Sequence, residues 1–254
     1  TTGKVDFTGA ALNVDNDVSV TGENVTMVAA TVNAGSAAFV AQNDIDFNGT
    51  VAVTGGNLSA TTKLASGGTI DADGFKLQAD NDITLTAADN IAADQIVTVD
   101  GNVTLTASNE VVIDAGVGAL DVDGTLTINS TSADATSIVT IKTGAVDAEN
   151  DVTISAGNAV EIDSAINVSS TGNIVITATN DVELGIGTTG TLTTTSGNIT
   201  VSTTTAGAGF DVKADAAGDQ ITASNDITIT SDDIQLGNLD STAAGNIVIT
   251  AAND

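Results

Sequence analysis

Apolar and hydroxyl residues alternate with a period of two in short segments that return along the whole chain. One such segment runs from Asn81 to Ala87 (NDITLTA) and consists of a turn dipeptide followed by the alternation. A period of two places Ile83 and Leu85 on one face of an extended strand and Thr84 and Thr86 on the other. Each segment therefore predicts a half-buried β-strand.

Copies of this segment return at intervals of 20 to 28 residues. The first inward-facing residues of the aligned copies are Ile83, Val103, Leu126, Val152, Ile174, Ile199, Ile227 and Ile247. The mean interval of roughly 23 residues is typical of one coil of a solenoid. Because the interval varies, we expect the loops to take insertions while the strands keep their places.

Three short strands fit within one interval. In the coil that begins at Gly101, they are predicted at 103–107, 111–115 and 119–123; the next examples are 152–156, 160–163 and 166–169, and then 174–178, 182–184 and 191–195. This pattern predicts an all-β fold, a parallel β-helix (β-solenoid) of about eleven coils of roughly 23 residues with three short strands each. We expect 1–254 to form a single domain, a rod on the order of 50 Å long. The main alternative, a two-sheet sandwich, requires hairpin turns.

The register before residue 80 is less regular. The segments that begin at Asn16 and Asn43 are good copies of the repeated strand, so we expect both to stack in line with the later copies. Between Ile45 and Ile83, however, 38 residues intervene, and they include a further copy at Gly56–Ser59. This region holds either two short coils or one coil with a long loop.

Asn and Gly recur at the predicted corners, where they supply the left-handed backbone conformations that sharp bends require. We expect stacked corner asparagines to form a ladder of side-chain amides, with members Asn102, Asn173, Asn198 and Asn246. The core is expected to hold Val, Ile, Leu and Ala, with occasional large side chains at Phe7, Phe39, Phe47, Phe75 and Phe210.

Composition and charge exclude several classes of function. The chain has 33 acidic residues against 5 basic ones and a net charge of −28. Binding of nucleic acid requires a basic surface, so we expect no nucleic-acid partner. No apolar run approaches the roughly 18 residues of a membrane span, so no membrane insertion is expected. Cysteine is absent, which excludes thiol chemistry.

The two ends of the chain suggest a piece of something longer. The start, Thr1 to Val5, lacks the charged and apolar regions of a signal peptide. The end, Ala251 to Asp254, stops where earlier copies begin another strand. We therefore expect a segment of a longer repetitive protein or a filament subunit. Because the ends of a β-helix expose strand edges, we expect its partners to be itself, stacked end to end, or flanking repeats.

Acidic runs at the corners are candidates for a calcium site. Ca²⁺ takes six to eight oxygen ligands, which carboxylates on neighbouring coils would supply. The candidate ligands are Asp15, Asp17, Asp80, Asp82, Asp121, Asp123, Glu149, Asp151, Asp232 and Asp233. Known calcium-loop motifs are absent, and Asp and Asn are also ordinary turn formers. Diffuse screening of the acidic rod by cations is the alternative. No other cofactor is expected.

Catalytic chemistry has little support. Carbohydrate-active sites on β-helices combine carboxylates with cationic or imidazole groups, whereas this chain lacks His and Arg. Alternation places Asp211, Lys213 and Asp215 on one outer face, which we interpret as a solvated salt-bridged surface. We expect no enzyme activity and no catalytic residue.

Hydroxyl residues form a predicted ladder on the outer face of the repeat. Its members are Thr84 and Thr86, Thr104 and Thr106, Thr153 and Ser155, Thr200 and Ser202, and Thr228 and Thr230. Regular hydroxyl and methyl arrays of this kind order water in ice-binding proteins, but Val175 and Val248 interrupt this one. Thr is also an ordinary residue for an exposed strand position.

The phrases at Gly197–Ser202 (GNITVS) and Asn180–Leu184 (NDVEL), in coils of this length, resemble the repeat region of filamentous-haemagglutinin-like secreted adhesins. The resemblance covers nearly the whole chain. It implies a right-handed β-helical shaft, an extracellular or cell-surface location, and a role in adhesion or scaffolding without catalysis. A glycan or protein of a cell surface would be the partner of an adhesin face. We therefore expect a structural shaft or filament segment of a bacterial surface protein.

Overall fold

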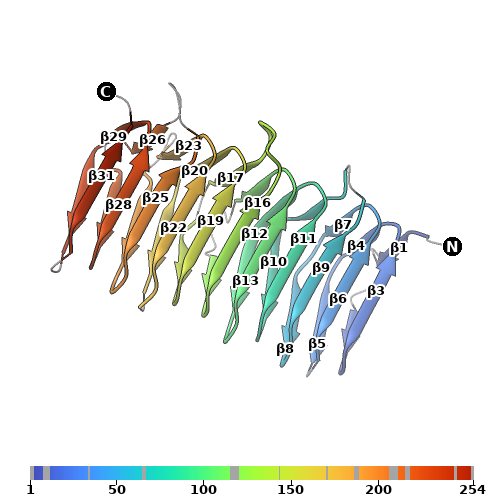
Figure 1. The fold of residues 1–254 in the computed structure, drawn as a ribbon. Helices are drawn as coiled ribbons and strands as arrows, with labels where there is room; N and C mark the ends of the chain where they lie inside the picture. Colours follow the sequence, from blue (N-terminus) through green and yellow to red (C-terminus); the bar gives the residue numbers. More distant parts are fainter. Residues whose placement is uncertain are drawn as a thin grey trace.

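The computed structural model describes residues 3–7, 12–33, 35–64, 67–114, 120–142, 144–169, 171–185, 189–205, 211–214, 218–242 and 245–252. Every regular element in these ranges is a β-strand. All pairings between these strands are parallel. The strands wind into a solenoid in which the chain advances coil by coil from one end to the other (Figure 1). The predicted parallel β-helix is confirmed.

One side of the solenoid is an eleven-stranded sheet that receives one strand from each coil. Each of these strands has five residues. They are β3 (Val18–Gly22), β6 (Ala37–Ala41), β9 (Leu58–Thr62), β11 (Ile83–Ala87), β13 (Val103–Ala107), β16 (Leu126–Ser130), β19 (Val152–Ala156), β22 (Ile174–Ala178), β25 (Ile199–Thr203), β28 (Ile227–Ser231) and β31 (Ile247–Ala251). The chain thus passes this side eleven times, which makes ten turns between β3 and β31.

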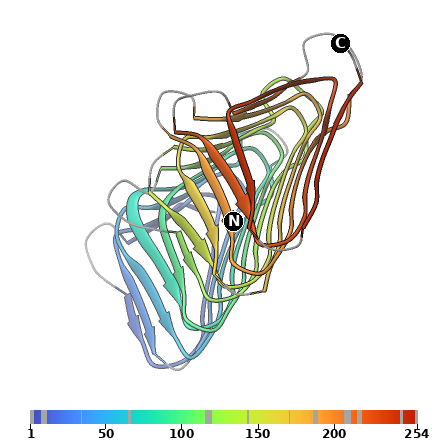
Figure 2. The same cartoon turned by 90° about the vertical axis from the view of Figure 1, so that its left-hand side faces the viewer.

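The rest of each coil belongs to a twenty-stranded sheet with two legs, seen from a second direction in Figure 2. Its first leg contains β1 (Val5–Phe7), β4 (Val25–Met27), β7 (Ile45–Phe47), β14 (Val111–Ile113), β17 (Ile138–Ile141), β20 (Ala159–Ile162), β23 (Asp181–Leu184), β26 (Asp211–Ala214) and β29 (Asp233–Leu236). Its second leg contains β2 (Leu12–Val14), β5 (Ala30–Asn33), β8 (Val51–Thr54), β15 (Leu120–Val122), β18 (Val146–Ala148), β21 (Ala165–Val168), β24 (Thr191–Thr194), β27 (Gln220–Ala223) and β30 (Asn238–Ser241). The long strands β10 (Ile70–Ala79) and β12 (Ile91–Thr98) span both legs.

The predicted register of the repeat from residue 83 onward is confirmed. Ile83 lies opposite Val103, Val103 opposite Leu126, and each later copy continues this series to Ile247. The three-strand division of the coils is also confirmed, except that β10 and β12 run through the corner that separates the legs elsewhere.

Before residue 80, one predicted copy is misplaced. The copy that begins at Asn16 forms β3 in the eleven-stranded sheet, as expected, but the one at Asn43 forms β7 in the twenty-stranded sheet. The strand that follows β3 in the eleven-stranded sheet is β6, and the copy at Gly56 provides β9. Two coils therefore separate β3 from β9, and one further coil leads to β11.

A column of aliphatic side chains fills the space between the sheets. At the first and third positions of the strands in the eleven-stranded sheet, residues such as Ile83 and Leu85 are fully buried. Phe39 and Phe47 are buried as expected, with their rings edge to face at a centroid distance of 5.3 Å. Phe7 packs against the core while partly exposed.

Two of the predicted core aromatics have other outcomes. The prediction is wrong for Phe75, which is only partly buried because it lies within the irregularity between Ala72 and Lys76 in β10. Phe210 lies outside the described residues.

The predicted left-handed conformation is confirmed at the corner glycines Gly55, Gly144 and Gly185, whose φ values are 78°, 82° and 78°. The glycines that begin copies of the repeat serve close packing instead. Gly101, Gly172 and Gly197 are absent from the glycines with positive φ. A Cβ atom on Gly197 would lie 1.8 Å from the carbonyl oxygen of Gly172 in the preceding coil. A Cβ atom on Gly101 would similarly lie 2.1 Å from the carbonyl carbon of Asn81. These positions take glycine because the backbones of successive coils nearly touch there.

Candidate functional site

Side-chain hydrogen bonds link successive coils at the corner that precedes each strand of the eleven-stranded sheet. The Asp82 carboxylate accepts bonds from the backbone nitrogen and Nδ2 of Asn102, at 2.8 and 3.1 Å. Asn102 Oδ1 in turn accepts a bond of 2.9 Å from the backbone nitrogen of Thr125. Each side chain thus supplies an acceptor to the coil that follows.

The predicted amide ladder is therefore present, but it contains carboxylates as well as amides. Asn173 donates to Asp151, Asn198 donates to Asn173, and Asn246 donates to Asp226. We call this series, with Asp82 and Asn102, the corner ladder. At the corner before each strand of the eleven-stranded sheet, side-chain oxygens take the place of backbone acceptors. The backbone N–H groups of the corner therefore remain hydrogen-bonded.

Five of the predicted calcium ligands are occupied by hydrogen bonds of this kind. Asp17, Asp80, Asp82 and Asp151 accept from backbone nitrogens, and Asp15 accepts from Asn33 Nδ2. Their oxygens secure turns between coils. Among the described residues, no group of three or more acidic side chains is arranged to hold a metal ion.

Four of the five remaining candidates, all except Asp232, belong to pairs of like charge on adjacent coils. Asp121 lies opposite Asp147, and Asp233 lies opposite Asp211. Repulsion by Asp123, followed by a hydrogen bond between the two side chains, raises the pKa of Glu149. Asp232 is buried, with 3% of its surface exposed. Like charges directly opposite each other destabilise a sheet, so these pairs are places where screening by cations would act.

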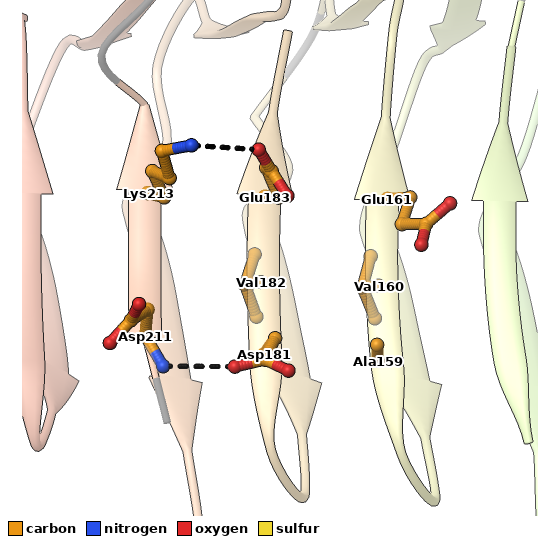
Figure 3. A pocket seen from close by; sticks show the side chains of 8 residues that line it. All are labelled: Ala159, Val160, Glu161, Asp181, Val182, Glu183, Asp211 and Lys213. Atoms are coloured by element: carbon orange, nitrogen blue, oxygen red, sulfur yellow. Dashed lines mark hydrogen bonds and ion pairs between the residues drawn. The ribbon is translucent and has the colours of Figure 1, made fainter. Parts of the chain in front are cut away.

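An acidic hollow of about 330 Å³ lies on the outer surface of β20, β23 and β26 (Figure 3). Glu161, Glu183 and Lys213 occupy equivalent positions on the three strands. Lys213 Nζ lies 3.1 Å from Glu183 Oε1, while the carboxylate of Glu161 points away from Glu183. At the other end of the hollow, the backbone nitrogen of Asp211 donates to Asp181 Oδ1 at 3.1 Å.

Burial and neighbouring charge disfavour ionisation around this hollow. Burial is the main cause of the raised pKa of Glu161; Glu183 and Asp163 add to it, and a hydrogen bond with Thr140 opposes it. Burial also raises the pKa of Asp211, with further contributions from Asp233 and Asp181. The ion pair of Lys213 is itself more than a third exposed.

The predicted salt-bridged surface at Asp211 and Lys213 thus joins two coils through Glu183, which we did not single out from the sequence; Asp215 lies outside the described residues. Glu161 and Glu183 were also missed as a pair. The sequence feature that could have revealed this pair is the similarity of Ala159–Ile162 (AVEI) to Asp181–Leu184 (DVEL). When the two segments stack as neighbouring strands, the two glutamates lie opposite each other.

In contrast to the acidic hollow, the outer surface of the eleven-stranded sheet is lined mainly by uncharged hydroxyl side chains. We define the hydroxyl face as the second and fourth residues of its eleven strands. The first file is Ser19, Ala38, Ser59, Thr84, Thr104, Thr127, Thr153, Val175, Thr200, Thr228 and Val248. The second file is Thr21, Val40, Thr61, Thr86, Thr106, Asn129, Ser155, Thr177, Ser202, Thr230 and Thr250.

The predicted hydroxyl ladder is confirmed by this register, and it extends beyond the predicted members. Seventeen of the twenty-two positions carry a Ser or Thr hydroxyl, and none carries a charge. The chain has a net charge of −28, so an uncharged surface that crosses all eleven strands departs from its average composition.

Two further findings bear on function. Within the described ranges, no helix is long and apolar enough to cross a membrane. Comparison of the chain with family models, curated proteins and solved structures gives no match in any of the three.

Proposed function

We propose that this chain is a non-catalytic structural shaft, a rigid segment of an extracellular bacterial surface protein of the filamentous-haemagglutinin-like kind. The observation that carries the proposal is the unbroken register of eleven five-residue strands, from Val18 beside Ala37 to Ile227 beside Ile247. A continuous parallel ladder over a single aliphatic column resists bending and separates whatever is attached to its two ends. The sequence resemblance described above supports the location and the adhesin-like context.

End-to-end continuation of the shaft belongs to the same proposal. In this structure β31 pairs with β28 on one side. Its inward residues Ile247 and Ile249 are 44% and 49% exposed, although their counterparts Ile227 and Ile229 are fully buried. A further coil, from flanking repeats or from another copy, would cover them. Strand edges of this kind pair readily with other strands.

A distance measurement tests the shaft directly. Because the chain has no cysteine, Ser19→Cys and Thr228→Cys create two unique labelling positions on outward-facing residues. These lie nine coils apart, so we expect a narrow distribution of dye separations near 43 Å, at ~4.8 Å per coil. Labels at Ser19→Cys and Thr104→Cys, four coils apart, are the matched control and should lie near 19 Å. A broad distribution, or equal distances for the two pairs, would contradict a rigid shaft.

Two other functions make different predictions for the same isolated chain. A ligand-binding adhesin would retain binding to cells or to a glycan array. An ice-binding protein would show thermal hysteresis, and the hydroxyl files of the eleven-stranded sheet are the observation that favours this second candidate. Thr84→Tyr, which interrupts the first file at β11, would then abolish hysteresis. Turnover on an oligosaccharide panel would contradict the absence of catalysis.

A further inference from the structure

The hydroxyl face differs from the rest of the outer surface in charge. None of its twenty-two positions is charged, whereas the outward positions of the twenty-stranded sheet include Asp46, Asp71, Glu161, Glu183 and Lys213. Charged residues flank the hydroxyl face along both long edges: Asp17 and the corner-ladder residues Asp82, Asp151 and Asp226 precede its strands, and Glu23, Lys63 and Asp89 follow them. The area between its edges is electrostatically neutral.

We propose that the hydroxyl face is a self-association surface, on which a second copy of this chain docks face to face. Charge selects this face for contact between two copies. Two chains with a net charge of −28 each repel one another wherever their acidic surfaces meet, and the cost of opposing like charges is several kcal/mol. The hydroxyl face lets two copies approach without placing carboxylates opposite each other.

The regular spacing also selects a second copy. All eleven strands of this sheet have five residues and keep straight register, without the irregularity that interrupts β10. The hydroxyl files of two copies therefore repeat at the same spacing, so contacts formed at one coil are repeated at each of the others. Thr and Val side chains, as at Thr153 and Val175, present methyl groups for packing and hydroxyls for hydrogen bonds across the interface.

The available area matches that of a stable interface. Eleven strands at ~4.8 Å and five residues at ~3.3 Å give a surface on the order of 800 Å². Specific protein interfaces bury about 800 Å² on each partner. The acidic surfaces outside the hydroxyl face of the two copies repel each other over longer distances. Salt screens this repulsion, because the Debye length is about 10 Å at 0.1 M ionic strength. Association should therefore strengthen as salt is added.

Sedimentation equilibrium of the intact chain in 50 mM and 500 mM NaCl tests the proposal. We expect a monomer–dimer equilibrium that shifts toward the dimer at the higher salt concentration. The double variant Thr104→Glu/Thr153→Glu places carboxylates within the face and should weaken the dimer at least about a hundredfold. The matched control, Thr31→Glu/Thr193→Glu, adds the same charge to outward positions of the other sheet and should associate like the original chain. Circular dichroism and melting temperature establish that both variants fold.

A cross-linking experiment locates the contact. Thr127 lies on β16, the middle strand of the eleven. A two-fold interface with full overlap of the faces brings this strand against its own counterpart, whether the rods are parallel or antiparallel. Thr127→Cys should therefore cross-link between copies with a short bismaleimide, and Thr193→Cys should not.

Several results would overturn the proposal. A chain that stays monomeric at millimolar concentration in both salts has no such interface. A dimer that survives Thr104→Glu/Thr153→Glu, or that is lost equally in the control variant, uses another surface. Thermal hysteresis or neutral-glycan binding by a monomer, lost in the face variant alone, would assign the face to ice or to glycan instead. The dye separations that test the shaft are measured on single molecules at picomolar concentration, where each chain is a monomer, so the two proposals can fail separately.

Discussion

Asp82 and Asn102 are joined twice, since one carboxylate oxygen accepts both the backbone nitrogen and the side-chain Nδ2 of the asparagine in the next coil. Asn102 then accepts the backbone nitrogen of Thr125 through its own side-chain oxygen. The corner ladder is thus directional, and the loss of one member leaves an amide without its acceptor in the coil that follows.

Removal of a ladder residue should destabilise the fold by a small but measurable amount. For Asn102→Ala we expect a loss of about 1 to 3 kcal/mol, because the variant loses the side-chain bonds and leaves the Thr125 amide without its partner. Asn129→Ala, which removes the same side chain from the hydroxyl face, should cost less than about 0.5 kcal/mol. Urea unfolding monitored by circular dichroism measures both. Equal costs would show that the ladder contributes nothing of its own.

Truncation in the core should cost more. Leu105 is fully buried, and Leu105→Ala should reduce the free energy of unfolding by about 2 to 5 kcal/mol, through lost transfer energy and the cavity left behind. Ile249→Ala, at a position that is 49% exposed in this structure, is the comparison and should cost markedly less. The same urea titration gives both values. A similar cost at the two positions would contradict the assigned burial.

Close contact between coils makes a corner glycine irreplaceable. Gly197→Ala would place a Cβ atom 1.8 Å from the carbonyl oxygen of Gly172, so the two coils must move apart. We expect a loss of at least about 2 kcal/mol. Gly3→Ala, where a Cβ atom meets nothing within 4 Å, should be nearly neutral. A tolerated Gly197→Ala would mean that the stacked corners lie farther apart than in this structure.

The pH dependence of stability should run opposite to ordinary acid denaturation over part of its range. Burial raises the pKa values of Glu161, Asp46, Asp94 and Asp211 in the folded state. A carboxyl whose pKa is higher in the folded state binds protons more tightly there. Stability is therefore lost as pH rises from the ordinary value, 3.8 for Asp and 4.5 for Glu, through the raised one.

We accordingly expect the melting temperature to rise as the pH falls from neutrality toward the ordinary carboxyl pKa values of 3.8 for Asp and 4.5 for Glu. Glu161→Gln removes one contributing group and should flatten the profile slightly while raising stability at neutral pH. Glu161→Asp keeps a carboxylate at the position and should preserve the slope. Differential scanning calorimetry across the range provides the measurement. A melting temperature that falls steadily on acidification would show that other carboxylates dominate.

Calcium and simple salt can be separated by matching ionic strength. The like-charge pairs Asp121 with Asp147 and Asp211 with Asp233 should be relieved by screening, so added NaCl should raise the melting temperature. If the predicted calcium sites exist, CaCl₂ at equal ionic strength should raise it further, and Asp121→Asn should reduce that excess. Equal effects of the two salts would assign the stabilisation to diffuse screening.

Much of this architecture could be predicted from sequence, because strict alternation specifies which side chains face the core. The placement of Ile83 through Ile247 in one sheet follows from that alternation alone. The copy at Asn43 was misplaced because the other sheet has the same kind of corner. There, Asn24 Oδ1 accepts the backbone nitrogen of Asp44, and Asp44 Oδ1 accepts that of Thr69. An Asn or Asp before a strand therefore marks a corner without saying which one.

The candidate sites were less predictable for a related reason. Acidic turns can be found in a sequence, but the hydrogen bonds that occupy Asp82 or Asp151 depend on which residue of the next coil lies beside them. The acidic hollow likewise depends on alignment between coils, since Glu161 and Glu183 are 22 residues apart in sequence and adjacent only through β20 and β23. The corner glycines also required the separation between coils to be known.

Strand pairing in this molecule reaches only one coil forward and one coil back, as in the series β13, β16 and β19. Stability is then a sum of local contributions, and damage at one position weakens its two neighbours without propagating farther. A whole coil can be duplicated or deleted while the surroundings of distant coils stay the same. Evolution could therefore adjust the reach of such a protein in steps of about 5 Å by recombination among its own repeats.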